Sequence, residues 1–282
     1  MSTNKKSIFV WSPFTSKVGT VQNVINSSYS INKYSKFNVN LVNAFGEWDN
    51  YIEDPNLEKV VIHDFKFLRF IKHWDKTGFL KSRFSYLLIF FFSFFPLFNL
   101  MKKEKPDFLI AHLISALPLT IFSLFDFKTK LILHVAGHPK LNFFRKMVWK
   151  ISSKNIYKVI SPSEELKKVF LDNKIFNDEQ VKVIEDPHLI VKKINRLKKH
   201  EIKDNFFDEN KILIAIGRMT KQKNYSFLIK NFKKITLKYT DIKLIIIGDG
   251  EEKSYLKNLI KELDIINKVK LIDYESNIYK YL

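Results

Sequence analysis

The sequence contains no cysteine among its 282 residues. Disulfide frameworks, thiolate zinc sites and cysteine nucleophiles are therefore excluded, and no oxidising compartment is required. A secretory signal is also missing: MSTNKKSIFVWSPF passes from two lysines into a short strand-like run, without a long apolar core or a small-residue cleavage site. These absences predict a protein that stays in the cytoplasm.

Acidic residues are few. There are 29 of them against 48 lysines and arginines, which gives a formal net charge of +19. Such an excess favours polyanionic partners, namely anionic lipid head groups, nucleotide diphosphates or nucleic acid. The lysines are spread over nearly every segment and no arginine-rich arm occurs. We therefore do not expect sequence-specific nucleic-acid binding.

Short β-branched or aromatic runs alternate with segments of helical period along the first two thirds of the chain. Val21, Val24, Ile25 and Tyr29, for example, recur at a spacing that gives a helix one apolar face. This alternation needs crossover connections, so it predicts an α/β fold with a parallel sheet covered by helices on both sides. The expected strands are 7–14, 37–45, 107–112, 130–136, 156–160 and 181–184.

A charged stretch at 188–210 interrupts this pattern and is expected to be a linker between two domains. Residues 1–187 then form a complete Rossmann-like domain. Residues 211–282 hold three further predicted strands, whereas a doubly wound domain has about five or six. The second domain is therefore expected to be partial. Its predicted strands are 211–216, 243–247 and 268–272.

The segment most informative about chemistry is GRMTKQKN, from Gly217 to Asn224, which follows a predicted strand and leads into a helix. Ligands bind at the carboxyl ends of strands in open α/β sheets, where helix N-terminal amides favour anions. Arg218 offers a planar fork for two phosphate oxygens and Lys223 a mobile charge, so the pair suits a diphosphate. From the residues alone, solvated loop cations explain the same pattern.

This loop, followed by LIIIGDGEEKSYLKNLIKEL, resembles the nucleotide-sugar domain of family 4 glycosyltransferases, which have the GT-B fold of two facing Rossmann-like domains. In that family a G-R-x-x-x-x-K loop grips the donor diphosphate, and a G-x-G-x-E stretch follows the next strand. The resemblance implies retaining hexosyl transfer from a nucleotide diphosphate sugar as co-substrate, with no metal or other cofactor. It implies diphosphate binding by Gly217, Arg218 and Lys223, and a cleft bordered by Gly248, Gly250 and Glu251.

The amino-terminal half resembles the same family more loosely. Gly19 and Thr20 open a helix after the first strand, as the family's glycine loop does beneath the donor phosphates. The resemblance implies that both residues bind the diphosphate. The family often has two adjacent glycines at this place, whereas this chain has Val18-Gly19. A plain turn glycine is the alternative reading.

Two histidines end predicted strands, His112 in LIAHLISALP and His134 in LILHVAGHPK. In the family a histidine near the end of a middle strand often faces the transferred sugar, and a neutral imidazole can both donate and accept a hydrogen bond. The alternative is a core or rim histidine. A metal pair of His134 and His138 is disfavoured, because no acidic residue nearby completes a ligand set. The loop Gly137, His138 and Pro139 resembles the family's G-x-P loop at the cleft.

Two further strand ends have simpler explanations. Ser163 is expected to cap the helix that follows the strand at 156–160. Glu185, Asp186 and Pro187 are explained by a turn at the end of the first domain.

The pair of glutamates that binds the donor sugar and ribose in complete family members is absent, and it would follow the last residues, Tyr281 and Leu282. We therefore expect a truncated chain. Two rivals to an active transferase stay open. One is an inactive relative that serves as a membrane-associated interaction protein, and the other is an epimerase of similar double-domain build, which the lack of a GxGxxG fingerprint disfavours.

Residues 84–101 run for 18 positions without a charge, which reaches the usual length of a spanning helix. Three readings stay open: a core helix, a true span and, as the preferred one, a helix lying in the interface of an anionic membrane. A span is least favoured because Lys102 leads at once into the strand at 107–112. The preferred reading predicts a protein on the inner face of the plasma membrane that contacts lipid through Phe90, Phe91, Phe92, Phe94 and Phe95.

Together these observations predict a glycosyltransferase of cell-envelope polysaccharide or glycolipid synthesis. Its acceptor is expected to be a saccharide or a lipid-linked saccharide. His112 and His134 are the candidate catalytic residues.

Overall fold

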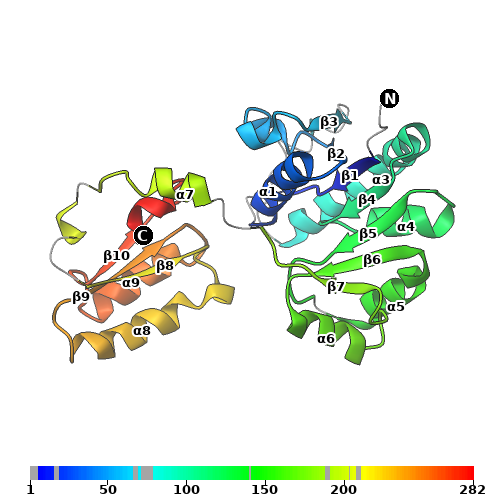
Figure 1. Ribbon diagram of the computed structural model, residues 1–282. Helices are drawn as coiled ribbons and strands as arrows, with labels where there is room; N and C mark the ends of the chain where they lie inside the picture. Colours follow the sequence, from blue (N-terminus) through cyan, green and yellow to red (C-terminus); the bar gives the residue numbers. More distant parts are fainter. Residues whose placement is uncertain are drawn as a thin grey trace. The chain divides into compact units, whose positions relative to one another are not determined.

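The structure is a computed structural model that describes residues 6–15, 19–65, 69–70, 79–139, 141–187, 191–202, 204–207 and 211–282. The chain divides into two compact units, Met1–His188 and Leu189–Leu282, which we call unit 1 and unit 2. Each unit has its own parallel sheet (Figure 1). Buried side chains form a separate hydrophobic core in each unit.

Unit 1 is built on a seven-stranded sheet in the order β3-β2-β1-β4-β5-β6-β7. Every pair of neighbouring strands is parallel. The strand order reverses between β1 and β4, and ligands of open sheets bind beside such a switch point, at the carboxyl ends of the strands. The strands are β1 (Lys6–Trp11), β2 (Phe37–Asn43), β3 (Val61–Asp64), β4 (Phe108–Ala111), β5 (Lys130–His134), β6 (Ile156–Ser161) and β7 (Val181–Val183).

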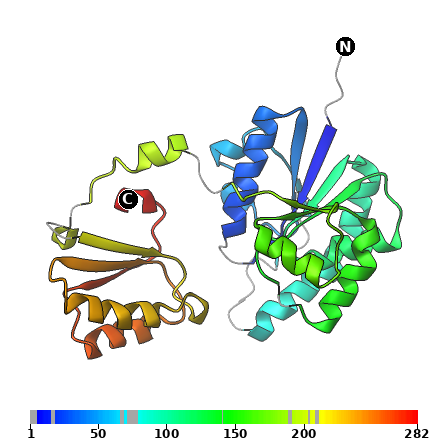
Figure 2. The same cartoon turned by 60° about the horizontal axis from the view of Figure 1, so that its bottom comes forward.

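Helices cover both faces of this sheet (Figure 2). One face carries α1, whose Val24 and Ile25 pack in a core with Val10 of β1. The opposite face carries the remaining long helices, in a larger core that includes Trp11 of β1 and Leu109 of β4. The helices are α1 (Gly19–Tyr34), α3 (Phe79–Glu104), α4 (Ala116–Leu124), α5 (Phe143–Ser152) and α6 (Glu164–Asp172), with the short turns η1 (Asp49–Tyr51), η2 (Pro55–Leu57) and η4 (Ser153–Asn155).

The apolar helix α3 buries one stripe of its surface. Ser85, Ile89, Ser93, Leu97 and Met101 recur every four residues and are almost fully buried. This spacing keeps them on one helix face, which packs on the core of unit 1 and next to α4. The helix is therefore a packed element of the first domain along its buried side.

Unit 2 holds a three-stranded parallel sheet in the order β10-β9-β8. Ile229 and Phe232 of α8, together with Leu256 of α9, form its core against Leu244 and Ile246 of the central strand. The elements are α7 (Val191–Leu197), η5 (Asn205–Phe207), β8 (Lys211–Ile216), η6 (Lys221–Lys223), α8 (Tyr225–Thr236), β9 (Ile242–Ile247), α9 (Lys253–Glu262), β10 (Val269–Ile272) and η7 (Ile278–Tyr281).

The α/β class and the parallel sheets are as predicted, with differences in detail. Strand β3 was not predicted, because VIHD is only four residues long and none of its residues is fully buried. The segment 188–210, expected as a linker, contains α7 and η5. The division between the units falls at its start. Ser163 caps α6 as expected, since its Oγ accepts from Leu166 N (3.3 Å).

Candidate active site

The predicted diphosphate loop lies at the carboxyl ends of β8 and β9 in unit 2. Gly217 N donates to Ile247 O and Met219 N donates to Asp249 O, both at 2.9 Å. Glu252 N donates back to Met219 O at 3.0 Å. The side chain of Met219 is also fully buried in the core of unit 2. Backbone hydrogen bonds and the packing of this side chain therefore both hold the loop after β8 in place.

Gly248 and Gly250 are required for the contact between these two loops. A Cβ on Gly248 would lie 2.0 Å from Gly217 O, and a Cβ on Gly250 would lie 2.3 Å from Met219 O. Both glycines also have positive φ, 150° and 159°, which a residue with a side chain rarely adopts. Their role in this structure is to let one loop approach the other, and the neighbouring Glu251 is exposed.

The two predicted phosphate-binding cations, Arg218 and Lys223, are exposed in this loop. The loop ends at Asn224, whose left-handed backbone (φ 51°, ψ 44°) turns the chain into α8. The cations therefore precede the amino end of a 12-residue helix, where free amides and the helix dipole favour an anion. Lys221 adds a third exposed cation between them.

In unit 1 the two predicted catalytic histidines lie together at the carboxyl edge of the sheet. The rings of His112, after β4, and His134, at the end of β5, have centroids 4.3 Å apart and are tilted by 34°. His134 Nε2 lies 3.0 Å from Asp186 Oδ1, and both of those side chains are buried. Among the residues that the structure describes, neither histidine has a hydrogen-bond partner at Nδ1.

Both rings are neutral near pH 7. Burial lowers the pKa of His112 well below its usual value, and the neighbouring His134 lowers it further. Burial also lowers the pKa of His134, and the carboxylate of Asp186 opposes this effect only in part. Nε2 of His134 faces the carboxylate of Asp186, and a neutral ring with its proton on Nε2 keeps a lone pair on Nδ1 that can accept a hydrogen bond. Asp186 was interpreted as a turn residue, although its position after β7 places it at the same sheet edge.

A cavity of about 320 Å³ brings several of the predicted residues together. Its lining includes Thr20, His112, His134, Gly137 and Pro139. His138 is exposed and is not part of this lining. Gly19 and Gly137 have room for a side chain, unlike Gly248 and Gly250 of unit 2. A Cβ on either would meet no described atom within 4 Å.

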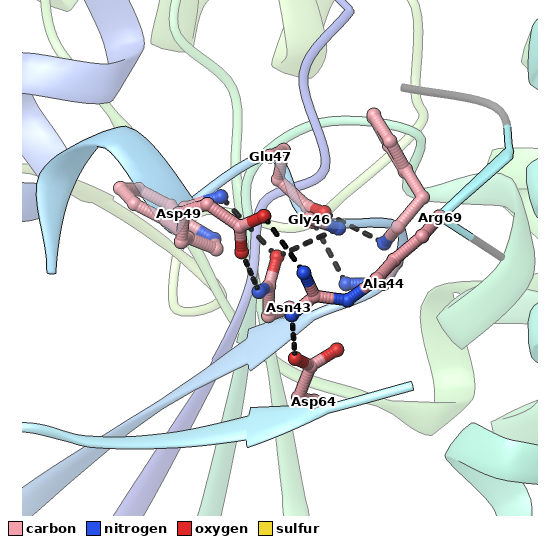
Figure 3. A network of polar contacts seen from close by, with 9 residues as sticks. Asn43, Ala44, Gly46, Glu47, Asp49, Asp64 and Arg69 are labelled. Atoms are coloured by element: carbon pink, nitrogen blue, oxygen red, sulfur yellow. Dashed lines mark hydrogen bonds and ion pairs between the residues drawn. The ribbon is translucent and has the colours of Figure 1, made fainter. Parts of the chain in front are cut away.

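Polar contacts hold the loop between β2 and β3, at the same edge of unit 1 (Figure 3). The buried carboxyl group of Glu47 accepts from Ala44 N (3.0 Å) and Phe45 N (2.8 Å). Burial raises the pKa of Glu47 to about 7. Asn43 Oδ1 accepts from Gly46 N (3.1 Å), so two side chains close the turn. This arrangement was not predicted from the sequence.

Arg69 extends the same network outward (Figure 3). Its guanidinium donates to Asp49 Oδ2 (3.2 Å) and to Asp64 Oδ2. Asn43 Nδ2 donates to the other oxygen of Asp49 (3.0 Å). These contacts tie the turn to the end of β3, so the network has a structural role beside the site.

The five phenylalanines predicted to touch lipid fall into two groups. Phe91, Phe92 and Phe95 are exposed, at 67%, 49% and 70%, and Phe91 and Phe95 lie on the side of α3 opposite its buried stripe. Phe90 and Phe94 are partly buried and pack against the core of unit 1, so they do not belong to this outer surface. Among the described residues, one helix is long and apolar enough to span a membrane by length and composition alone, Arg83–Glu104.

Cations flank this helix in the sequence. Lys102 and Lys103 in its last turn, and Lys105 after it, are exposed. Those that precede it at Lys72, His73 and Lys76 lie outside the described residues.

Two comparisons of sequence connect the chain to known proteins. Residues 185–282 match the family model for group 1 glycosyl transferases. An uncharacterized glycosyltransferase of Methanocaldococcus jannaschii is 31% identical over 205 residues, which are 67% of this chain and 50% of that relative. The N-acetylgalactosamine-N,N'-diacetylbacillosaminyl-diphospho-undecaprenol 4-alpha-N-acetylgalactosaminyltransferase of Campylobacter jejuni is 39% identical over 74 residues, 26% of this chain and 20% of that relative. This chain thus spans half or less of the length of both relatives.

Solved structures extend the likeness to the whole chain. The crystal structure of Anabaena HepE in complex with UDP matches 98% of this chain and 71% of that chain, with a TM-score of 0.62 and 15% identity. Identity this low shows the fold alone, and the fold is the one that the resemblance predicted. Residues 185–282 thus match a glycosyl transferase family model, 205 residues are similar to a glycosyltransferase relative, and the whole chain has the GT-B fold.

Proposed function

We propose that this chain takes part in sugar transfer from a nucleotide diphosphate sugar, and that the loop Gly217–Lys223 binds the donor diphosphate. The proposal depends on the backbone hydrogen bonds and the close contact between this loop and the segment Gly248–Gly250, which we call the backbone lock. The backbone lock holds Arg218 ahead of the amino end of α8. Two findings support it: the loop lies within the residues that match the family model, and the structural neighbour HepE is in complex with UDP.

The diphosphate is the leaving group of this reaction. Negative charge grows on its terminal phosphate as the bond to the sugar breaks, and fixed cations and amides aimed at that charge lower the barrier. Arg218 and Lys223 supply the cations, and the amino end of α8 supplies the amides. We propose that this set serves without a metal or other cofactor and that transfer retains the anomeric configuration, as the family 4 resemblance implies.

We assign the acceptor side to unit 1. His112 and His134 line the 320 Å³ cavity, and the lone pair on Nδ1 of His134 can accept a hydrogen bond from a sugar hydroxyl. Asp186 is a positioning residue that fixes the tautomer. The acceptor is proposed to be a saccharide or a lipid-linked saccharide in polysaccharide or glycolipid synthesis. The name of the Campylobacter jejuni relative, which includes diphospho-undecaprenol, supports the lipid-linked form.

Calorimetric titration with UDP, GDP and ADP tests the donor site. Arg218→Ala and Lys223→Ala should each weaken binding of the tightest of the three about tenfold or more, because each removes a charge-assisted contact to phosphate. Lys230→Ala is the matched control, since Lys230 is an exposed lysine on α8 beyond the loop. Unchanged affinity in Arg218→Ala would remove the site assignment.

We also propose that the protein is cytoplasmic and lies on the inner surface of the plasma membrane. The exposed aromatic face of α3, the lysines at its carboxyl end and the net charge of +19 support this location. Replacing Phe91, Phe92 and Phe95 together by Ser should lower co-sedimentation with anionic vesicles about tenfold or more. Leu237→Ser, at an exposed position of unit 2, is the control. Equal sedimentation of the triple variant and the control contradicts the proposal.

A further inference from the structure

Unit 1 contains a second and larger cavity that the donor chemistry does not use. It has a volume of about 660 Å³ and lies between α3, α4, α5 and the loop after β1. Small-molecule sites commonly measure about 300–1,000 Å³. Its walls are mainly hydrophobic, with Phe14, Leu87, Phe90, Leu119 and Trp149 among them. Such walls offer few hydrogen bonds to a saccharide, so they suit an apolar ligand.

Two arginines are the only charged residues in these walls, within the part of the chain that the structure describes. Arg83 comes from α3 and Arg145 from α5, and both are exposed. The Arg145 guanidinium lies 6.0 Å from the ring of Trp149, which is itself part of the wall. A ligand that matches this cavity has an apolar body and a strongly anionic group, because guanidinium groups bind phosphate oxygens in pairs.

The larger cavity adjoins the histidine cavity. Leu113, Ser115 and Trp149 line both of them. The loop between the cavities is held by Trp11, whose Nε1 donates to Ile114 O (3.2 Å). Ile114 has a φ of 48°, a left-handed conformation that is strained for a β-branched residue. The shared wall is thus fixed in one shape by a buried residue of β1.

Part of the rim of the larger cavity is apolar and open to solvent. Leu87 of α3 and Phe144 of α5 line it, and they are 54% and 72% exposed. The exposed face of α3 continues from Leu87 to Phe91 and Phe95, and that of α5 includes Phe143. An apolar chain can therefore pass from a membrane surface into the cavity along this apolar part of the rim.

We infer that the larger cavity binds the prenyl diphosphate part of a lipid-linked acceptor. The prenyl chain packs on the apolar walls, Arg83 and Arg145 bind the diphosphate, and the sugar beyond the diphosphate reaches the adjoining cavity with His112 and His134. This inference rests on the proposed function and names the acceptor class for the same site. It assigns α5 a role in the acceptor site that the sequence analysis did not predict.

Farnesyl diphosphate, titrated into the whole chain without vesicles, tests the inference through the fluorescence of the wall residue Trp149 and through calorimetry. Farnesyl diphosphate should bind at least about tenfold more tightly than farnesol or inorganic diphosphate. Farnesol lacks the anionic group for the arginines, and inorganic diphosphate lacks the apolar chain for the walls. Arg145→Gln should weaken binding about tenfold because it removes a contact to phosphate. Val148→Asp should weaken it by a similar factor because it places a carboxylate in the apolar wall.

Matched controls come from the same helix. Lys150→Gln and Ile151→Asp make the same kinds of change at exposed positions outside the cavity lining, and they should alter binding by less than about twofold. Val148 is itself 41% exposed, so its replacement leaves the core intact. An unchanged urea denaturation curve, followed by the tryptophan fluorescence of unit 1, will show that the fold is intact in every variant of α5.

Two results would overturn the inference. One is equal farnesyl diphosphate affinity in Val148→Asp and Ile151→Asp. The other is that inorganic diphosphate binds as tightly as farnesyl diphosphate and that Arg218→Ala abolishes this binding. That result would place the anion in the loop of unit 2. The donor proposal fails separately, through UDP binding that is indifferent to Arg218→Ala.

Discussion

The two units hold their site loops in different ways. In unit 2 the loops after β8 and β9 touch backbone to backbone, and Gly248 and Gly250 leave no room for a Cβ. In unit 1 the glycines at the corresponding edge, Gly19 and Gly137, have open space around them. Side chains hold the loops there instead, as in the contact of His134 with Asp186.

This difference explains why the site residues of unit 2 form a recognisable sequence pattern and those of unit 1 do not. A backbone lock needs glycines at fixed positions in two short segments, so unit 2 carries a contiguous pattern, and the family model matches residues 185–282. The contacts of unit 1 join residues that are far apart in the chain. His134 and Asp186 are 52 positions apart, and such pairs leave no local pattern.

The largest effect is expected where the backbone lock is broken. Gly248→Ala places a Cβ 2.0 Å from Gly217 O at a φ of 150°, which should destabilise unit 2 by about 4 kcal/mol through overpacking and backbone strain. Hydrogen exchange in peptides from β8 and α8 should become correspondingly faster. Gly137→Ala is the control in unit 1 and should change exchange little there. Equal effects of the two substitutions would break the comparison between the units.

A titrating side chain sharpens the account of unit 1. Burial raises the pKa of Glu47 from 4.5 to about 7. Between these values the folded state keeps a proton that the unfolded state has released, so the free energy of unfolding falls as the pH rises through this window. The loss amounts to about 3 kcal/mol, and Glu47→Gln should abolish it because glutamine does not titrate.

Urea denaturation at about pH 5 and about pH 7 should measure about 2 kcal/mol of this loss. Tryptophan fluorescence reports on unit 1, since all four tryptophans precede residue 188. Glu53→Gln, an exposed change nearby, should keep the pH dependence of the parent chain. The same pH dependence in Glu47→Gln would show that Glu47 is not the titrating group.

The smallest effect is expected at the histidine pair. Asp186→Asn removes the carboxylate that opposes the effect of burial on His134, so the pKa of His134 should fall further below its usual value. An NMR titration of the imidazole measures this shift, with the exposed neighbour Glu185→Gln as the control. A raised or unchanged pKa would argue against the contact.

Local features of the fold and the site could be predicted from the sequence. The position of Arg218 after a strand and before a helix follows from neighbouring residues, and so does the place of His112 at a strand end. The stacking of His112 on His134 depends on the pairing of β4 with β5, which periodicity does not reveal. The same holds for Phe90 and Phe94, because a run of apolar residues does not show which side of α3 packs on the core.

Hydrogen exchange of the whole chain with and without saturating UDP shows whether the loop Gly217–Lys223 binds the donor nucleotide. The donor-loop account predicts slower exchange in the peptide that covers residues 217–225, and loss of this protection in Arg218→Ala. Binding of UDP with no protection of that peptide, or with the same protection in Arg218→Ala, would contradict it.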